Sequence, residues 1–577
     1  MKKHIALCAG LMALGLGLTA CSGAKDSAET AAEETTAGTA TTEAVSETSS
    51  EEESSAAANE VEPEGLAHIP VTVEERALTS YASDTQALVA EADYFTLALP
   101  EEAAKEYPAL ATTLDEKAKD DAAKAQDKIL ELAAEFQDIA EYSSDFDSTL
   151  TEKLKPKVMR ADANILSILC EGEAYSGGAH GDYWTEGRNY DPASGRELKL
   201  SDVVPDREKL TTLVREKFSE KYTTAEFGDA LTNAADYLAT LSDSDYEATP
   251  WTMDSEGLTL YFPQYTLGPY AAGAQDISIA FTEAPELFSA KYLETCDAYV
   301  IPLVDARTYE LALGDGKPVA VSVELSSDGV SDTYTCAYSI GNTSLHSENY
   351  CYSAENYIVY AGGEHYIYSF SSSDNDYMSL EVVDVEKKSL EEGRSVNASL
   401  YRPIFSWSEE GDYDMRSTGG AAFTNPDHMV LERRMEVLGT TSGRRSYHVG
   451  ADGYPESDDA YYTLPLSYAI RTKKEMTLDT VDAKGEKTGT ETIPAGTYLI
   501  GIRSDADQIE DLQLIDASEL NIEEGDGWSS FTVKDGSDVQ ADLTKPIYRV
   551  TVDHSDWPNL VNGEAVDQLF DGVIYAG

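Results

Sequence analysis

The stretch "ADANILSILCEGEAYSGGAHGDYWTEGRNYD", Ala161–Asp191, contains two strand-like runs separated by a bend that is rich in glycine. In the first run, Leu166, Ile168 and Cys170 alternate with other residues, and a period of two places them on one face of a β-strand. Gly177 and Gly178 lie between the runs, where positive φ or a bulge is easiest to accommodate. The stretch therefore predicts two strands of a sheet joined at the glycines.

The flanking segments predict helices beside that sheet. Upstream, residues 106–142 carry apolar side chains at steps of three and four, and Pro108 suits the first turn of a long helix. Downstream, a second amphipathic pattern follows Asp206, and "EGLTLYFPQYTLGPYAAGAQDISIAF", Glu256–Phe281, again alternates as strands do. Helices and strands that pack together in this way predict an α+β domain.

The remainder of the chain has a strand-rich pattern. Residues 296–462 contain short strand-like runs at intervals of 8–12 residues, which predicts an all-β module, either a sandwich or a propeller-like array. Near the C-terminus, "IPAGTYLIGI", Ile493–Ile502, resembles the strand-turn pattern of bacterial SH3-like barrels. We therefore expect a small β-barrel at the end of the chain.

The N-terminal segment predicts export and lipid attachment. Lys2 and Lys3 precede an apolar run that is too short to span a bilayer, and Leu18–Cys21 matches a bacterial lipobox. We expect Cys21 to carry lipid and to anchor the protein to the outer face of the cytoplasmic membrane of a Gram-positive bacterium. An ordinary signal peptide followed by a chance cysteine is the alternative.

The segment after Cys21 consists mainly of Ser, Thr, Ala and Glu and lacks aromatic residues, so it predicts a disordered acidic tether. The roughly 510 residues that follow exceed what one hydrophobic core accommodates. The expected organisation is a signal peptide (1–20), the tether (21–66), the α+β domain (67–295), the all-β module (296–462) and the barrel (463–577).

The strongly negative net charge of the chain limits which binding partners are expected. The chain has 106 Asp and Glu against 42 Lys and Arg, a net charge of −64. Because like charges repel, this balance disfavours nucleic acid as a partner and favours cationic ones, although a solvated acidic surface without any partner is also common.

Four cysteines remain besides Cys8 of the signal peptide and Cys21, and none has the spacing of a metal site. Cys336 and Cys351 could form a disulfide. A two-residue turn at Gly341 and Asn342 would instead place Cys336 opposite Ser347, so the disulfide requires a longer loop. Buried free thiols are the alternative.

Three segments together resemble a known extracytoplasmic unit. They are "YSGGAHGDYWTEGRNYDPASGRELKLSDVV", Tyr175–Val204, a helix, and the strands that end at Phe281. The order and local sequences are similar to a domain of unknown function found in RsiV-like anti-sigma factors and in PdaC-like cell-wall deacetylases. In the RsiV-like proteins this ectodomain binds lysozyme, so the resemblance implies a binding domain. This sequence lacks their cytoplasmic sigma-binding segment and transmembrane helix, and also the catalytic domain of the PdaC-like proteins.

His180 has three interpretations. A metal ligand would need partner ligands that the neighbouring sequence does not supply, and a general base would need a nucleophile for which no motif is present. The favoured interpretation is structural: the glycines set the backbone, and His180 packs against the turn. His365, in a second Gly-Gly-x-His sequence, indicates another hairpin. We expect no cofactor and no metal, and no catalytic motif is found.

The aromatic residues beside these turns are the candidate ligand-binding site, because rigid aromatics bury contact area at low entropic cost. The candidates are Tyr175, His180, Tyr183, Trp184, Tyr261, Tyr265 and Tyr270. Ordinary packing within the sheet is the alternative. The function expected is a non-enzymatic binding protein for a cell-envelope or host ligand, specifically a lysozyme-like cationic protein. A glycan-active hydrolase or deacetylase and a structural wall-binding module are the alternatives.

Overall fold

The computed structural model describes residues 65–575 except for short segments at 83–85, 144–145, 223–236, 268, 271–272, 315–317, 328–332, 375–376, 392, 410–412, 526–527, 535–539 and 556. The expected signal peptide, Cys21 and almost all of the tether lie outside the described residues. Within the described part of the chain, no helix is long and apolar enough to cross a membrane.

A seven-stranded sheet contains the stretch that the sequence singled out. Its strands, in spatial order, are β19 (Ile404–Glu409), β20 (Asp414–Ala421), β1 (Thr72–Tyr81), β2 (Leu88–Ala98), β3 (Leu150–Ala161), β4 (Leu166–Tyr175) and β5 (Asp182–Tyr190). Neighbours are antiparallel except β2 and β3, whose parallel pairing requires a crossover connection. That connection contains α1 (Glu101–Glu106) and the long helix α2 (Pro108–Tyr142).

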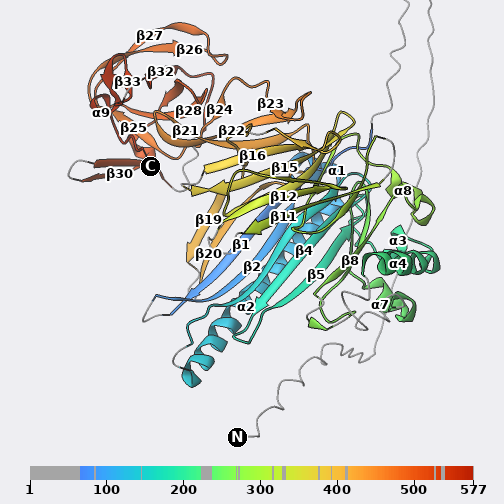
Figure 1. Cartoon of the computed structure of the whole chain (residues 1–577). Helices are drawn as coiled ribbons and strands as arrows, with labels where there is room; N and C mark the ends of the chain where they lie inside the picture. Colours follow the sequence, from blue (N-terminus) through green and yellow to red (C-terminus); the bar gives the residue numbers. More distant parts are fainter. Residues whose placement is uncertain are drawn as a thin grey trace, which may run out of the picture. The chain divides into compact units, whose positions relative to one another are not determined.

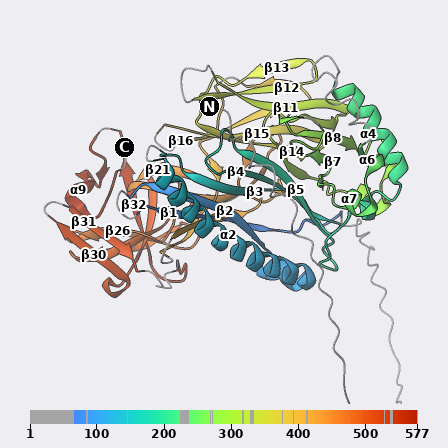
Figure 2. The ribbon, with the colours of Figure 1, turned by 90° about the horizontal axis from the view of Figure 1, so that it is seen from below.

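Helix α2 covers one face of this sheet, as Figure 1 and Figure 2 show. Pro108 occupies its first turn, as predicted, and its apolar stripe is buried at Leu110, Leu114, Ala125, Ile129 and Leu132. An ion pair also ties the helix to the sheet, since Arg188 of β5 donates to a carboxylate oxygen of Asp121 at 2.6 Å. The predicted helix and the predicted strands are thus confirmed and packed together.

A second layer follows β5 in the chain. It contains a three-stranded sheet of β6 (Trp251–Met253), β7 (Gly257–Phe262) and β8 (Gln275–Ala280), with the helices α3 (Leu200–Val203), α4 (Arg207–Lys221), α6 (Tyr237–Thr240) and α7 (Asp243–Glu247). Asp206 caps α4 by accepting a hydrogen bond from the backbone N–H of Lys209 at 3.0 Å. Asn189 of β5 donates to the carbonyl of Trp251 at 2.8 Å, so this layer is hydrogen-bonded to the larger sheet. The N-terminal region is α+β, as expected.

The middle of the chain forms two antiparallel sheets. The first contains β10 (Tyr309–Ala312), β11 (Pro318–Ser327), β12 (Tyr334–Ile340) and β13 (Thr343–His346). The second contains β17 (Ser389–Leu390), β16 (Tyr377–Asp384), β15 (Glu364–Ser373), β14 (Ser353–Ala361) and β9 (Tyr299–Pro302). Ile358 and Ile367 face a core shared with the first sheet, whereas Val359 and Tyr368 face a separate core on the opposite side. The second sheet is therefore buried on both faces.

A fourteen-stranded sheet contains most of the remaining strands. Its main path runs through β18 (Ser399–Leu400), β21 (Met429–Val437), β22 (Gly439–Val449), β24 (Tyr462–Thr463), β28 (Tyr498–Ser504), β29 (Ile509–Leu514), β32 (Ile547–Asp553), β26 (Met476–Val481) and β27 (Lys487–Ile493). Branching from it are β23 (Pro455–Glu456), β25 (Ala469–Thr472), β33 (Leu560–Val561), β34 (Glu564–Ala565) and β35 (Phe570–Asp571), while β30 (Leu520–Gly525) and β31 (Trp528–Val533) form a separate hairpin. The pairing among the described strands does not close into a ring, because β27 at the end of the path pairs only with β26. The C-terminal region is rich in β-structure as expected, and an SH3-like barrel is not confirmed.

The two candidate disulfide cysteines are present as buried thiols. The turn at Gly341 is the tight one, and the backbone N–H of Ser347 donates to the carbonyl of Cys336 at 2.9 Å. The chain then returns, and Cys351 pairs with Tyr334 across an isolated bridge. The Cys351 side chain lowers the pKa of the Cys336 thiol, and the Ser369 hydroxyl lies 3.4 Å from the Cys336 sulfur. The disulfide stays a prediction.

Candidate functional site: an aromatic cluster at the end of a hairpin

The β4–β5 hairpin positions the glycine-rich bend at one end of the seven-stranded sheet. Its register runs from Leu166 opposite Tyr190 to Ala174 opposite Asp182, which leaves residues 176–181 as the connection. Gly177 has φ +80°, and a Cβ atom there would lie 3.1 Å from the side chain of Ile139 and 3.2 Å from that of Phe146. The backbone conformation favours glycine at this position, as the sequence indicated, and the two side chains leave little room for a Cβ atom.

His180 stacks against an aromatic side chain from a different part of the chain. Its ring centroid lies 4.2 Å from that of Tyr270, with an interplanar angle of 29°. The Tyr270 hydroxyl donates to the carbonyl of Gly181 at 3.4 Å, and Nδ1 of His180 lies 3.1 Å from the same oxygen. The loop between β7 and β8 is therefore packed against the end of the hairpin.

Two exposed tyrosines extend this contact. Tyr265 follows β7 and lies 5.7 Å from Tyr270 between ring centroids. Tyr183 is the second residue of β5, and its hydroxyl lies 3.9 Å from where a Cβ atom at Gly181 would be. Their side chains are 61% and 52% exposed, respectively. We call His180, Tyr183, Tyr265 and Tyr270 the aromatic cluster.

Tyr265 has φ +66°, a left-handed conformation that is costly for a bulky residue. Such strain persists only where surrounding structure imposes it, and it is concentrated at functional sites in proteins. An exposed aromatic ring in a strained backbone conformation is therefore a notable feature of this loop.

The remaining three aromatic candidates are held by packing. Tyr261 is buried on β7, where burial raises the pKa of its hydroxyl to about 12 and Thr252 lies at hydrogen-bonding distance, 2.6 Å. The ring of Trp184 covers Gly172, at which a Cβ atom would lie only 2.0 Å from the ring. Tyr175 packs against the core beneath α2. These three side chains stabilise the hairpin and the adjoining strands.

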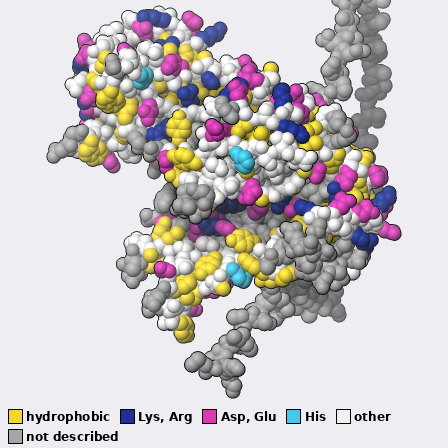
Figure 3. Space-filling view, in the orientation of Figure 1, with side chains coloured by type: hydrophobic (Ala, Val, Ile, Leu, Met, Phe, Trp, Pro, Cys, Tyr) yellow, Lys and Arg dark blue, Asp and Glu magenta, His cyan; other side chains and the backbone are white. Residues whose placement is uncertain are grey.

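Between them, the two chain segments that form the aromatic cluster contain acidic residues and no Lys or Arg. Residues 173–187 contain the acids Glu173, Asp182 and Glu186, residues 257–275 contain none, and neither segment contains a Lys or an Arg. Glu173 lies directly opposite Tyr183 in the hairpin register. Figure 3 shows that acidic and basic side chains are interspersed on the face it displays. Aromatic faces attract Lys and Arg side chains, so the cluster can contact a cationic surface.

Sequence reasoning did not find a buried polar group around His365. The predicted hairpin is present, with Gly362 and Gly363 at positive φ between β14 and β15, but the His365 side chain is buried. Its Nδ1 lies 2.9 Å from a carboxylate oxygen of Glu386, and its Nε2 lies 3.5 Å from Glu256. Glu256 is 109 positions away in the chain, and no local pattern connects such residues.

The described residues contain no group of three or more His, Cys, Asp or Glu side chains placed to hold a metal ion. His180 itself stacks on an aromatic ring and lies beside a carbonyl oxygen. The geometry around His180 is suited to contact with a ligand surface.

The fold up to Phe281 is α+β, and its three-stranded sheet is hydrogen-bonded to the larger sheet through Asn189 and Trp251. Residues 201–282 match the family described as "Protein of unknown function (DUF3298)". The chain thus contains a DUF3298 domain, which includes the loop that carries Tyr265 and Tyr270, whereas the hairpin that carries His180 precedes it.

Two solved structures of the same family are similar to part of the chain. A DUF3298 family member from Bacteroides fragilis NCTC 9343 is 20% identical, with a TM-score of 0.28, and the match covers 39% of this chain and 94% of that one. A DUF3298 family protein from Pseudomonas aeruginosa PAO1 is 16% identical, with a TM-score of 0.27 and coverage of 39% and 97%. No curated protein matches. A domain of unknown function is consistent with the expectation from sequence, and the specific resemblance to RsiV-like and PdaC-like proteins stays a prediction.

Proposed function

We propose that this chain is a lipid-anchored extracytoplasmic binding protein whose aromatic cluster contacts a cationic protein, with a lysozyme-like protein as the specific ligand. The observation that carries the proposal is the cluster of His180, Tyr183, Tyr265 and Tyr270, in which the two segments meet and Tyr183 and Tyr265 are exposed. Such clusters of rigid aromatics supply most of the binding energy in many protein interfaces.

Charge supports the choice of a cationic ligand. Glu173 lies opposite Tyr183 of the cluster, and the whole chain has a net charge of −64. Opposite charges across an interface raise the association rate, while central aromatic contacts determine how long the complex lasts. The lipobox at Leu18–Cys21 supports anchoring outside the cytoplasmic membrane, where such a ligand is encountered.

The proposal is tested by measuring the affinity of the purified chain for hen lysozyme and for cytochrome c, another small basic protein. The measurement is made at about 0.15 M salt, where charges more than about 8 Å apart are largely screened. We expect lysozyme to bind and cytochrome c to bind much more weakly. Equal binding of both proteins, or loss of lysozyme binding at this salt concentration, would show that only net charge is recognised and would overturn the specific proposal.

A further inference from the structure

A pocket of about 260 Å³ lies in the C-terminal sheet, away from the aromatic cluster in the chain. Strands β22, β25, β28 and β29 contribute to it, together with the end of the chain. Its lining is mainly apolar and includes Leu438, Leu464, Ile470, Leu512, Val573 and Ile574. Two lining side chains, those of Tyr468 and Ile574, are more than half exposed, so the pocket is open to solvent.

One carboxylate lies in this apolar lining. Glu510 of β29 is only 6% exposed, and its Oε2 accepts a hydrogen bond from the backbone N–H of Leu438 at 3.3 Å. A Cβ atom at Gly501 would lie 2.8 Å from Oε1, so the missing side chain at Gly501 provides the room for this oxygen. None of the described residues that line the pocket is a Lys or an Arg.

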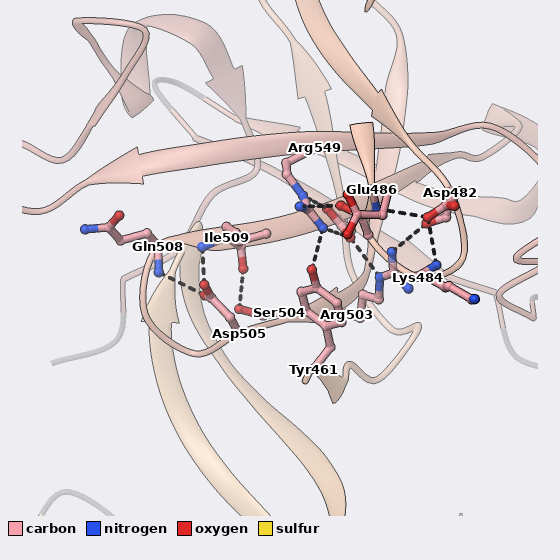
Figure 4. Close-up of polar contacts among 12 residues, drawn as sticks. Tyr461, Asp482, Lys484, Glu486, Arg503, Ser504, Asp505, Gln508, Ile509 and Arg549 are labelled. Atoms are coloured by element: carbon pink, nitrogen blue, oxygen red, sulfur yellow. Dashed lines mark hydrogen bonds and ion pairs between the residues drawn. The ribbon is translucent and has the colours of Figure 1, made fainter. Parts of the chain in front are cut away.

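The next residue on the same strand, Asp511, is a buried carboxylate that is stabilised by cations. Asp511 is fully buried and accepts hydrogen bonds from Arg503 at 2.8 Å and from Arg549 at 2.7 Å. Figure 4 shows these two arginines beside Tyr461, on the side of the sheet that carries the β26–β27 turn. Successive residues of a strand point to opposite faces, so these guanidinium groups lie on the other face of the sheet from the Glu510 carboxylate.

This environment changes the pKa of the Glu510 carboxyl. Burial raises the pKa of Glu510 to about 8, opposed by its bond from Leu438 and reinforced by the nearby charge of Asp511. Tyr468 also lines the pocket, and the Tyr575 hydroxyl and Glu436 lie nearby, with Glu436 paired to Arg434 at 3.6 Å. The groups that shift the pKa of Glu510 include no cation. A buried carboxylate without a cation is unfavourable, and a ligand that brings one would relieve the cost.

We propose that this pocket binds a small organic ammonium ion, whose alkyl body packs against the apolar lining and whose N–H groups donate to the Glu510 carboxylate. Pockets that combine apolar walls with one oriented polar group are the usual form of small-ligand sites. The inference does not depend on the proposed function, because it concerns a different region of the chain.

The probe is n-butylammonium, whose ammonium group resembles that of Lys and stays charged up to a pH of about 10. n-Butanol and butyrate serve as the neutral and anionic probes of matched size, and Nα-acetyl-lysine amide tests whether a lysine side chain is taken instead of a free amine. Binding is measured by calorimetry on the full chain at pH 6 and pH 7. We expect n-butylammonium to bind more tightly than n-butanol, with an affinity that rises about tenfold per pH unit below the pKa of Glu510 as the carboxylate ionises.

The variant Glu510→Gln retains the shape of the side chain and removes its charge. It should abolish both the preference for n-butylammonium and the rise with pH, whereas Glu475→Gln, at an exposed acid of the same region, should leave both unchanged. Tighter binding of the lysine amide than of n-butylammonium would identify lysine side chains as the source of the cation. No saturable binding of n-butylammonium, equal binding of n-butanol, stronger binding of butyrate, or an unchanged Glu510→Gln variant would each overturn the proposal.

Discussion

At the scale of single residues, the most informative side chain is His365. The sequence correctly indicated the hairpin around it, because two consecutive glycines before it favour a tight turn. Its two carboxylate partners could not be predicted, since Glu256 is brought to it only by the packing of the β6–β7 turn against the middle sheets. The Tyr299 hydroxyl also contacts both Glu256 and His365, and the Tyr360 ring lies 4.6 Å from that of His365 between centroids.

This arrangement predicts a pH-dependent contribution to stability. Burial lowers the pKa of His365, but the bonds to Glu256 and Glu386 outweigh burial, so the pKa is raised above its ordinary value of 6.5. The stabilisation is thus fully present below pH 6.5 and is lost as the pH rises through the folded-state pKa.

In the wild type, the unfolding free energy should therefore fall as the pH rises, by at most about 1.4 kcal/mol per pH unit from this group. The variant His365→Gln should lack this slope. Denaturant unfolding between pH 6 and pH 9 measures the slope for both proteins. Parallel curves for the wild type and the variant would contradict the assignment, whatever their vertical offset.

At the scale of elements, the bend between β4 and β5 offers a matched pair of glycines. Gly177 has φ +80° and two side chains near its missing Cβ, whereas a Cβ atom at Gly178 would have only a carbonyl oxygen at 3.7 Å. We expect Gly177→Ala to lower the unfolding free energy by about 1 kcal/mol or more, because alanine is strained at positive φ.

Gly178→Ala is the control and should change stability by less than about 0.5 kcal/mol. Chemical denaturation of the two variants gives the comparison directly. Equal effects of the two substitutions would mean that the left-handed conformation is not confined to Gly177.

The β26–β27 turn provides a second prediction at this scale. Arg503 donates to the carbonyl of Asp482 and Arg549 donates to that of Gly485, and both arginines also bind Asp511, so one buried carboxylate holds the turn on the sheet. Asp511→Asn leaves two guanidinium groups without their counter-charge and should cost about 3–5 kcal/mol.

Asp479→Asn, which removes an exposed partner of Lys487, should cost no more than about 1 kcal/mol. Thermal and denaturant unfolding of both variants measure the difference. A loss at Asp511 as small as that at Asp479 would show that the two arginines are stabilised without it.

At the scale of the whole molecule, local pattern predicted the elements better than their partners. Periodicity identified α2 and the strands of the N-terminal region, because an element with one buried face has apolar residues at regular spacing in the sequence. It did not show that β20 pairs with β1, so that Thr72 lies opposite Ala421. Such pairing uses backbone groups that every residue carries, and residues far apart in the chain leave no shared period.

For the candidate site too, the sequence indicated the residues but not their partners in space. The aromatic residues were singled out by their position beside turns, and sequence alone did not separate exposed Tyr265 from buried Tyr261. Strand β7 is buried along its entire length, whereas Tyr265 follows its end. Only the approach of the β7–β8 loop to the hairpin distinguishes the members of the cluster from the packing residues.

The central claim is that the aromatic cluster contacts a cationic protein, and the affinity of lysozyme for a pair of tyrosine variants tests it most directly. Tyr265→Ala removes an exposed ring of the cluster, and Tyr377→Ala removes a ring of similar exposure, 58%, from β16. At about 0.15 M salt, we predict that Tyr265→Ala weakens binding about tenfold or more, the scale of an interface aromatic, while Tyr377→Ala leaves the dissociation constant unchanged. Equal affinity of the wild type and both variants, or equal weakening of both, would contradict the claim.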